Sequence, residues 1–136
     1  MTKRIKQRII NNIKSKYNSL DKNKFIDGLT LFNRKCHVNA VSNKLKKDYK
    51  VLLTVCIGND EVFVHFINQD DEGNYIDDTL GWYGKELYDY YLIREVTSNI
   101  ECSHIWETLN YTKKMLIEQN TNWLERCLKF ATKDDV

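Results

Sequence analysis

Proline is absent from the 136-residue sequence, and glycine occurs only five times. No glycine-rich phosphate loop, GxGxxG fingerprint or cluster of metal-ligating residues is present. These absences argue against nucleotide-dependent and metal-dependent catalysis, so we expect no cofactor and no bound metal. The lack of proline, together with abundant Asn and Lys, points to an AT-rich genome such as that of a phage or a low-GC bacterium.

Long apolar segments are also missing. No stretch approaches the roughly 20 apolar residues that span a bilayer, and the N-terminus lacks the apolar core of a secretory signal. We therefore expect a cytoplasmic protein without membrane contacts, in the host cytoplasm if a phage encodes it. No CxxC pair occurs, and a cytoplasmic setting predicts that all four cysteines stay reduced: Cys36, Cys56, Cys102 and Cys127.

The composition is typical of a globular protein. Hydrophobic residues make up 42% of the chain and the formal net charge is only +2, whereas a disordered chain is less hydrophobic and more highly charged. The length suits a single domain over residues 1–136. The positive charge is concentrated in TKRIKQRIINNIKSK near the start, which offers a basic surface for nucleic acid.

Hydrophobic spacing predicts helices toward both ends of the chain. Residues 3–17 and 36–47 carry apolar side chains at helical intervals, and Val38, Val41 and Leu45 form the predicted apolar face of the second segment. Two further helices are predicted at 104–118 and 122–133. Their predicted buried side chains are Trp106, Leu109 and Leu116 in the first and Trp123, Leu124 and Cys127 in the second.

Four strands are predicted between these helices, at 49–58, 61–69, 74–82 and 87–96. The run YKVLLTVCIG is apolar on both faces and rich in β-branched residues, as is typical of a central strand. Gly58-Asn59-Asp60 then predicts a tight hairpin turn. The order of elements predicts an α+β fold, with a small antiparallel sheet of three to four strands packed against the Cys36 helix and flanking helices.

Cys36 stands at the predicted start of the second helix, directly after Arg34 and Lys35. The unpaired N–H groups and the dipole of a helix N-terminus favour an anion, and neighbouring cations add to this effect. These are conditions that stabilise a thiolate, and the same N–H groups could stabilise an oxyanion. Taken alone, such a cysteine is more often a small buried apolar residue. The other three cysteines have no obvious base and are expected in the core or on a neutral surface.

His65 is the best placed of the three histidines to act as a base for Cys36. It interrupts the apolar run FVHFI, where an imidazole is costly unless a hydrogen bond satisfies it. Its side chain and those two residues away share one strand face, which we expect to hold the Cys36 helix. Asp77 and Asp78 lie about a hairpin away. Because they are consecutive, only one of them can orient the imidazole.

Three short motifs occur on the helix, the strand and the next predicted strand: CHVNA at 36–40, HFIN at 65–68 and IDDTLG at 76–81. Their order resembles the transglutaminase-like branch of the papain-like cysteine peptidase superfamily. The resemblance covers residues 33–82 and leaves a helical C-terminal extension at 103–134. Phe66-Ile67 stands where that family usually has Ala-Trp, and Asp78 where it commonly has proline.

The resemblance implies cysteine-dependent acyl transfer. Cys36 would attack an amide carbonyl, His65 would move the proton and Asp77 would orient the imidazole. Water or an amine would then resolve the thioester, so that a protein or peptide substrate is hydrolysed or transamidated. Nearby residues are expected to bind the oxyanion or the substrate: Asn33, His37, Trp82 and Tyr83.

A second hypothesis keeps the same scaffold without catalysis. A catalytically inactive binding protein could hold a protein or nucleic-acid partner through the aromatic run GWYGKELYDYY or through the basic first helix. The two hypotheses differ in the reactivity that they predict for Cys36.

Overall fold

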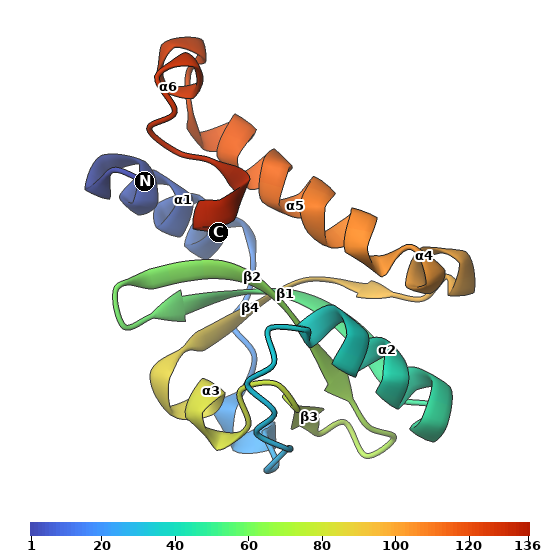
Figure 1. Cartoon of the computed structure of the whole chain (residues 1–136). Helices are drawn as coiled ribbons and strands as arrows, with labels where there is room; N and C mark the ends of the chain where they lie inside the picture. Colours follow the sequence, from blue (N-terminus) through green and yellow to red (C-terminus); the bar gives the residue numbers. More distant parts are fainter.

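A four-stranded antiparallel sheet forms the centre of the protein, with strands in the order β3-β2-β1-β4 (Figure 1). The computed structural model describes residues 1–136. The predicted α+β fold is confirmed. The elements in chain order are α1 (Lys3–Lys16), η1 (Lys22–Lys24), α2 (Cys36–Lys47), β1 (Lys50–Gly58), β2 (Glu61–Gln69), β3 (Tyr75–Ile76), α3 (Trp82–Leu87), β4 (Asp89–Val96), α4 (Asn99–Ser103), α5 (Ile105–Asn120), α6 (Trp123–Cys127) and η2 (Lys133–Asp135).

The hairpin of β1 and β2 is closed by a two-residue turn. Gly58 pairs with Glu61, and Asn59 and Asp60 between them have φ values of 48° and 60°. Positive φ at both central residues matches the right-handed twist of the two strands, and Asn and Asp tolerate it better than most residues do. The tight turn predicted here is confirmed.

The third strand is shorter than predicted. Of residues 74–82, only Tyr75 and Ile76 pair with β2, and Trp82 instead begins α3. The strand ends because the Asp77 side chain accepts hydrogen bonds from the backbone of Thr79 and Leu80 and so closes a turn. The outer edge of β2 is therefore unpaired from Glu61 to Ile67.

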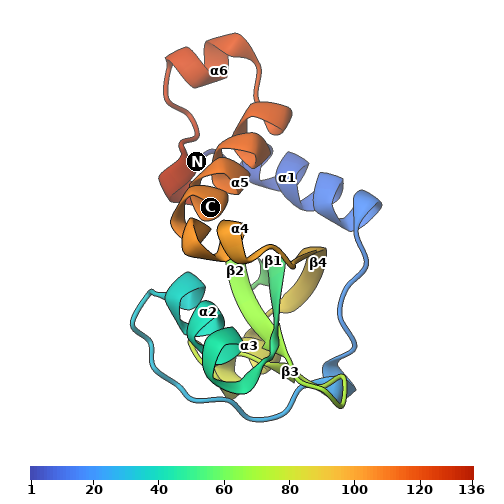
Figure 2. The same ribbon diagram turned by 90° about the vertical axis from the view of Figure 1, so that its right-hand side faces the viewer.

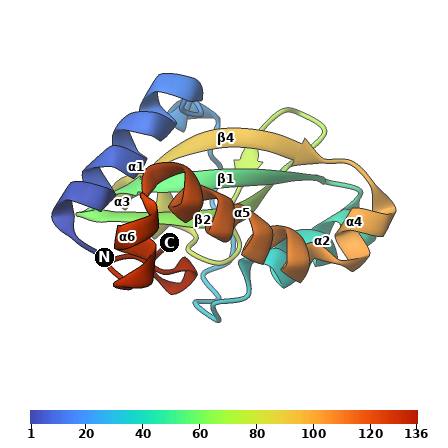
Figure 3. The same ribbon diagram turned by 90° about the horizontal axis from the view of Figure 1, so that it is seen from above.

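Helices and loops cover the two faces of the sheet unequally. Helices α1 and α5 lie together over one face, as Figures 1 and 3 show, and Ile5, Ile9 and Ile13 of α1 enter the larger apolar cluster there. Tyr88 and Tyr90 lie in a smaller cluster on the opposite face, together with residues from the chain after α1. No helix of the fold is both long and apolar enough to cross a bilayer.

Helix α2 lies beside the sheet (Figure 2), and its buried side chains show that a different face points inward from the one predicted. Val38 and Leu45 are 49% and 79% exposed, whereas Ala40 and Asn43 are buried. The inward face joins the apolar cluster through Cys36 and Ala40, and it also carries a polar contact where Asn43 meets Asn68 beneath the helix. The Asn43 amide donates to the Asn68 Oδ1 at 3.0 Å, and the Asn68 amide donates to the carbonyl oxygens of Ala40 and Lys50. These bonds join α2 to β2 and β1.

The C-terminal helices also differ from prediction. Helix α6 ends at Cys127, and Lys129 is in the left-handed region with φ of 55°, so the helix predicted at 122–133 is only one short segment. Leu109 and Leu116 of α5 are buried as predicted. The other predicted core positions are exposed: Trp106, Trp123, Leu124 and Cys127.

We predict that Ile9→Ala lowers the free energy of unfolding by about 2–5 kcal/mol, because it leaves a cavity under α1 in a fully buried site. Leu45→Ala on the exposed face of α2 is the matched control and should change it by less than about 0.5 kcal/mol. Urea unfolding measures both values. A large loss in Leu45→Ala would contradict the observed orientation of α2.

Candidate active site

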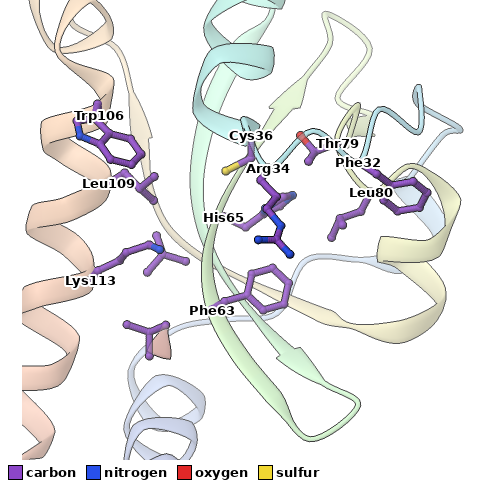
Figure 4. A pocket seen from close by; sticks show the side chains of 12 residues that line it. Phe32, Arg34, Cys36, Phe63, His65, Thr79, Leu80, Trp106, Leu109 and Lys113 are labelled. Atoms are coloured by element: carbon purple, nitrogen blue, oxygen red, sulfur yellow. The ribbon is translucent and has the colours of Figure 1, made fainter. Parts of the chain in front are cut away.

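A pocket of about 440 Å³ opens beside the unpaired edge of β2, between that strand, the start of α2 and α5 (Figure 4). Most of the side chains that line it are apolar, and a few are polar. The polar lining residues are Arg34, His65, Thr79 and Lys113, and Cys36 is also exposed to the pocket. The apolar lining residues are Phe32, Phe63, Val64, Leu80, Trp106, Leu109 and Val136.

Cys36, His65 and Asp77 meet at this pocket from three separate parts of the chain. Cys36 is the first residue of α2, His65 lies in β2, and Asp77 follows β3 directly. The His65 Nε2 donates to the Asp77 Oδ2 at 2.8 Å, and both side chains are buried. With Nε2 bound to the carboxylate, Nδ1 is the ring nitrogen left for Cys36. Asp78 points elsewhere and accepts from the Leu29 backbone and the Asn43 side chain.

Cys36 and His65 approach one another at the edge of the sheet. Cys36 packs in the larger apolar cluster with Val64, whereas Phe63 and Ile67, which share the strand face of His65, contact the smaller cluster. The expectation that α2 packs on the His65 face is therefore wrong. The contact exists because no strand pairs with β2 at this point, so that the start of α2 can lie against its edge.

Asp77 is held by four donors. Besides His65, the Tyr90 hydroxyl donates to its Oδ2 at 2.6 Å. The backbone N–H groups of Thr79 and Leu80 donate to its Oδ1 at 2.9 and 3.0 Å. A buried carboxylate is tolerated only when its oxygens are satisfied in this way. The same bonds fix the carboxylate in the orientation that His65 needs.

Gly84 is required by the close approach of α3 to this carboxylate. A Cβ atom at this position would lie 1.9 Å from the Tyr90 hydroxyl oxygen and 3.1 Å from the Asp77 Oδ2. Only glycine leaves room for the tyrosine to reach the aspartate. Helix α3 was not predicted from the sequence. It contributes to the site because Gly84 has no side chain, which leaves space for the Tyr90 hydroxyl beside Asp77.

The pKa values of the three groups favour a charged pair. Burial raises the pKa of the Cys36 thiol, but the positive charge of His65 and the nearby polar groups of His37, His65 and the Phe66 backbone lower it to about 6. Burial lowers the pKa of His65, whereas the charges of Asp77 and Cys36 raise it to about 10. Burial raises the pKa of Asp77, but the His65 charge lowers it overall. Between about pH 6 and 10, Cys36 is thus a thiolate and His65 an imidazolium.

The remaining cysteines lack such surroundings. Burial and the nearby Asp77 charge raise the pKa of Cys56 well above its ordinary value, and burial raises the pKa of Cys102. Cys127 is exposed. The charge of Lys44 near Cys102 does not offset burial there, and among the cysteines with a shifted pKa only Cys36 lies beside a histidine cation that lowers it.

The start of α2 also provides hydrogen-bond donors. The first amides of a helix have no acceptor within it, and no side chain caps α2 at Lys35. The N–H groups at the start of this helix therefore lie next to the Cys36 sulfur. A carbonyl oxygen that becomes negatively charged there would be stabilised.

None of the four side chains predicted to bind the oxyanion or the substrate lines the pocket. Asn33 is exposed and bonds with Asn39 and with the Lys35 backbone, so it shapes the loop before α2. Trp82 and Tyr83 stack on one another at 3.8 Å outside the pocket lining. They lie outside because α3 replaces the end of the predicted third strand.

His37 has a different place from the outer contact predicted for it. Its ring is buried and packs against Trp106, with ring centroids 5.1 Å apart. Its Nδ1 is buried without a hydrogen-bond partner, and the nearby ring is one of the influences that lower the thiol pKa.

Three residues that contribute to the site were not predicted from the sequence: Tyr90, Gly84 and Lys113. Tyr90 lies in a tyrosine-rich run that packing alone explains. Gly84 carried one available signal, because glycine is scarce in the chain and a glycine inside a helix is costly. Lys113 lies on α5, which follows the motif region, and nothing local marks it.

Comparison with known proteins gives no relative: no family model, curated protein or solved structure matches the chain. The site also contains no group of three or more His, Cys, Asp or Glu residues arranged to hold a metal ion.

We predict that alkylation of Cys36 by iodoacetamide rises with pH through a midpoint near 6 and then stays level, because the thiolate is the reactive form. In His65→Ala the midpoint should move up by at least one pH unit. Mass spectrometry resolves the rates at Cys36 and at Cys56, which serves as the buried internal control. Equal midpoints in the two proteins would contradict the thiolate–imidazolium pair.

We also predict that Gly84→Ala and Tyr90→Phe are coupled. Gly84→Ala should destabilise the protein because its Cβ displaces the Tyr90 hydroxyl, and Tyr90→Phe should cost about 1–3 kcal/mol for the lost donor to Asp77. The double variant should be more stable than the sum of the single effects by about 1 kcal/mol or more, since Phe removes the clashing atom. Strict additivity in urea unfolding would contradict the contact.

Proposed function

We propose that this chain is a cysteine-dependent acyl-transfer enzyme that attacks amide bonds. The observation that carries the proposal is the buried Cys36, His65 and Asp77 arrangement at the floor of a pocket, with the carboxylate bonded to the imidazole at 2.8 Å. A structural ion pair would not require a depressed thiol pKa or an opening toward solvent beside the sulfur. Perturbed pKa values in a cleft favour a functional site.

The first half-reaction forms a thioester. The Cys36 thiolate adds to the amide carbonyl carbon, the C–S bond forms, and the carbonyl electron pair moves to oxygen. The N–H groups at the start of α2 stabilise this oxyanion. His65 then donates its proton to the amide nitrogen, the C–N bond breaks, and the amine leaves.

The second half-reaction releases the acyl group. Neutral His65 takes a proton from water or from an acceptor amine, whose oxygen or nitrogen attacks the thioester carbonyl. The C–S bond breaks, and Cys36 leaves as the thiolate beside the imidazolium. Asp77 stays ionised throughout, keeps the ring orientation and stabilises the imidazolium.

We also propose that the resemblance to the transglutaminase-like branch of the papain-like superfamily extends to the roles of these residues. The supporting observation is that Asp77, rather than Asp78, lies against the imidazole, on the segment that follows β3. A protein or peptide amide is the proposed substrate, since the pocket is open and largely apolar.

We predict that the protein forms a covalent acyl adduct on Cys36 when mixed with an activated acyl ester such as p-nitrophenyl acetate. The acylation rate should rise through about pH 6 and fall as His65 loses its proton near pH 10. Cys36→Ser should abolish the adduct, and Asp77→Asn should lower the rate by about 100-fold or more. The p-nitrophenolate release and the intact mass measure these effects.

Cys127→Ser is the control, because it removes an exposed thiol remote from the pocket. It should leave the rate unchanged. Circular dichroism confirms that Asp77→Asn is folded, since Asp77 also closes the turn after β3. A Cys36 that remains unmodified in folded protein would overturn the proposal and favour the binding-protein hypothesis.

A further inference from the structure

Two cations stand on opposite walls of the pocket without a counter-charge. Figure 4 shows Arg34 reaching in from the loop before α2 and Lys113 reaching in from α5. Neither side chain forms an ion pair with an acidic residue of the protein. By contrast, the next lysine along α5, Lys114, pairs with Glu118.

No acidic side chain of the pocket lining neutralises these cations. None of its 12 lining residues is Asp or Glu. The nearest carboxylate of the site, Asp77, lies behind His65 with both oxygens engaged. The charges of the Cys36 thiolate and the His65 imidazolium offset one another. The side chains of the pocket lining therefore carry a net positive charge, and the low-polarity walls strengthen its field.

The rest of the lining is apolar and in part aromatic. Phe32 and Trp106 line the pocket while 55% and 56% exposed, and Phe63 of β2 also lines it, drawn below Arg34 in Figure 4. Exposed aromatic side chains of this kind supply contact area for an apolar or aromatic group. The pocket thus combines an anion-attracting rim with an apolar surface.

We infer that the site takes amides that carry a carboxylate next to the reacting carbonyl, together with an apolar or aromatic group. This inference rests on the proposed acyl transfer and names its substrate class. Arg34 and Lys113 attract the carboxylate into the pocket that holds the Cys36 sulfur, and the aromatic side chains contact the apolar part. The two cations are specificity-determining residues, and neither takes part in proton transfer.

The test compares two alkylating probes that differ in charge alone. In both, the Cys36 sulfur bonds to the probe's methylene carbon and iodide leaves, but iodoacetate is anionic and iodoacetamide is neutral. Each rate at Cys36 is divided by the rate with a neutral model thiol, N-acetylcysteine amide. The normalised rate for iodoacetate should exceed that for iodoacetamide about tenfold, and added salt should reduce the difference.

Variants of the two cations show which residues cause the preference for iodoacetate over iodoacetamide. Arg34→Gln and Lys113→Gln should each lower the iodoacetate rate about three- to tenfold, as expected for loss of one partly exposed charge contact, and leave the iodoacetamide rate nearly unchanged. Arg34→Lys should restore most of the preference. Lys114→Gln removes the same charge from the neighbouring position of α5, outside the pocket lining, and should have little effect.

Protection of Cys36 from iodoacetamide identifies the preferred anion. N-benzoylglycine, which has an aromatic ring, an amide and a carboxylate, should protect at lower concentration than its neutral analogue N-benzoylglycinamide. Protection by phenyl phosphate but not by N-benzoylglycine would overturn the carboxylate assignment.

The outcomes separate this inference from the proposed function. Fast labelling of Cys36 by both probes with no charge preference would overturn the inference and leave acyl transfer standing. Slow labelling by both would overturn acyl transfer itself. A preference that survives in Arg34→Gln and Lys113→Gln would also overturn the inference, because the His65 charge alone would then explain it.

Discussion

The ion pair between His65 and Asp77 is buried, and much of the surrounding structure makes that burial tolerable. Two charges removed from water destabilise a protein unless their remaining hydrogen-bonding capacity is met. Asp77 meets this condition with the Tyr90 hydroxyl and two backbone N–H groups. On the other side of the imidazole, the thiolate of Cys36 supplies a second negative charge. The imidazolium therefore lies between two anions, which is why both its proton and its orientation are held firmly.

The predictable part of the fold is the part fixed by local rules. The hairpin turn followed from Asn59 and Asp60, and the apolar run of β1 marked the central strand. The orientation of α2 did not follow, because Val38 and Leu45 look like core positions while the helix turns Asn43 inward toward Asn68. A polar contact between residues distant in sequence overrides apolar spacing here, and spacing carries no information about the partner.

In the site, too, some residues could be predicted from their local sequence, whereas others depend on contacts between distant segments. The helix start at Cys36 and the isolated imidazole of His65 were visible in the sequence, since each is an unusual residue for its local surroundings. Tyr90 was not visible, because its hydroxyl acts through a contact with Asp77 that only the folded sheet creates. The placement of Asn33 was not visible, because its distance from Cys36 along the chain does not show that its side chain bonds to the loop before α2. A single residue that is unusual for its local surroundings can be found from the sequence. The residues that hold it in place through distant contacts can be found only from the tertiary structure.

The separation of these residues along the chain has a consequence for folding. Cys36, His65, Asp77 and Tyr90 belong to four different segments, and their contacts form only once α2 has docked on β2 and β4 has paired with β1. Contacts of long sequence separation form late and cooperatively. An incompletely folded chain therefore carries a thiol of ordinary acidity, and the nucleophile arises with the native state. The reactivity of the sulfur is in this sense a property of the completed fold, and it disappears when that fold opens.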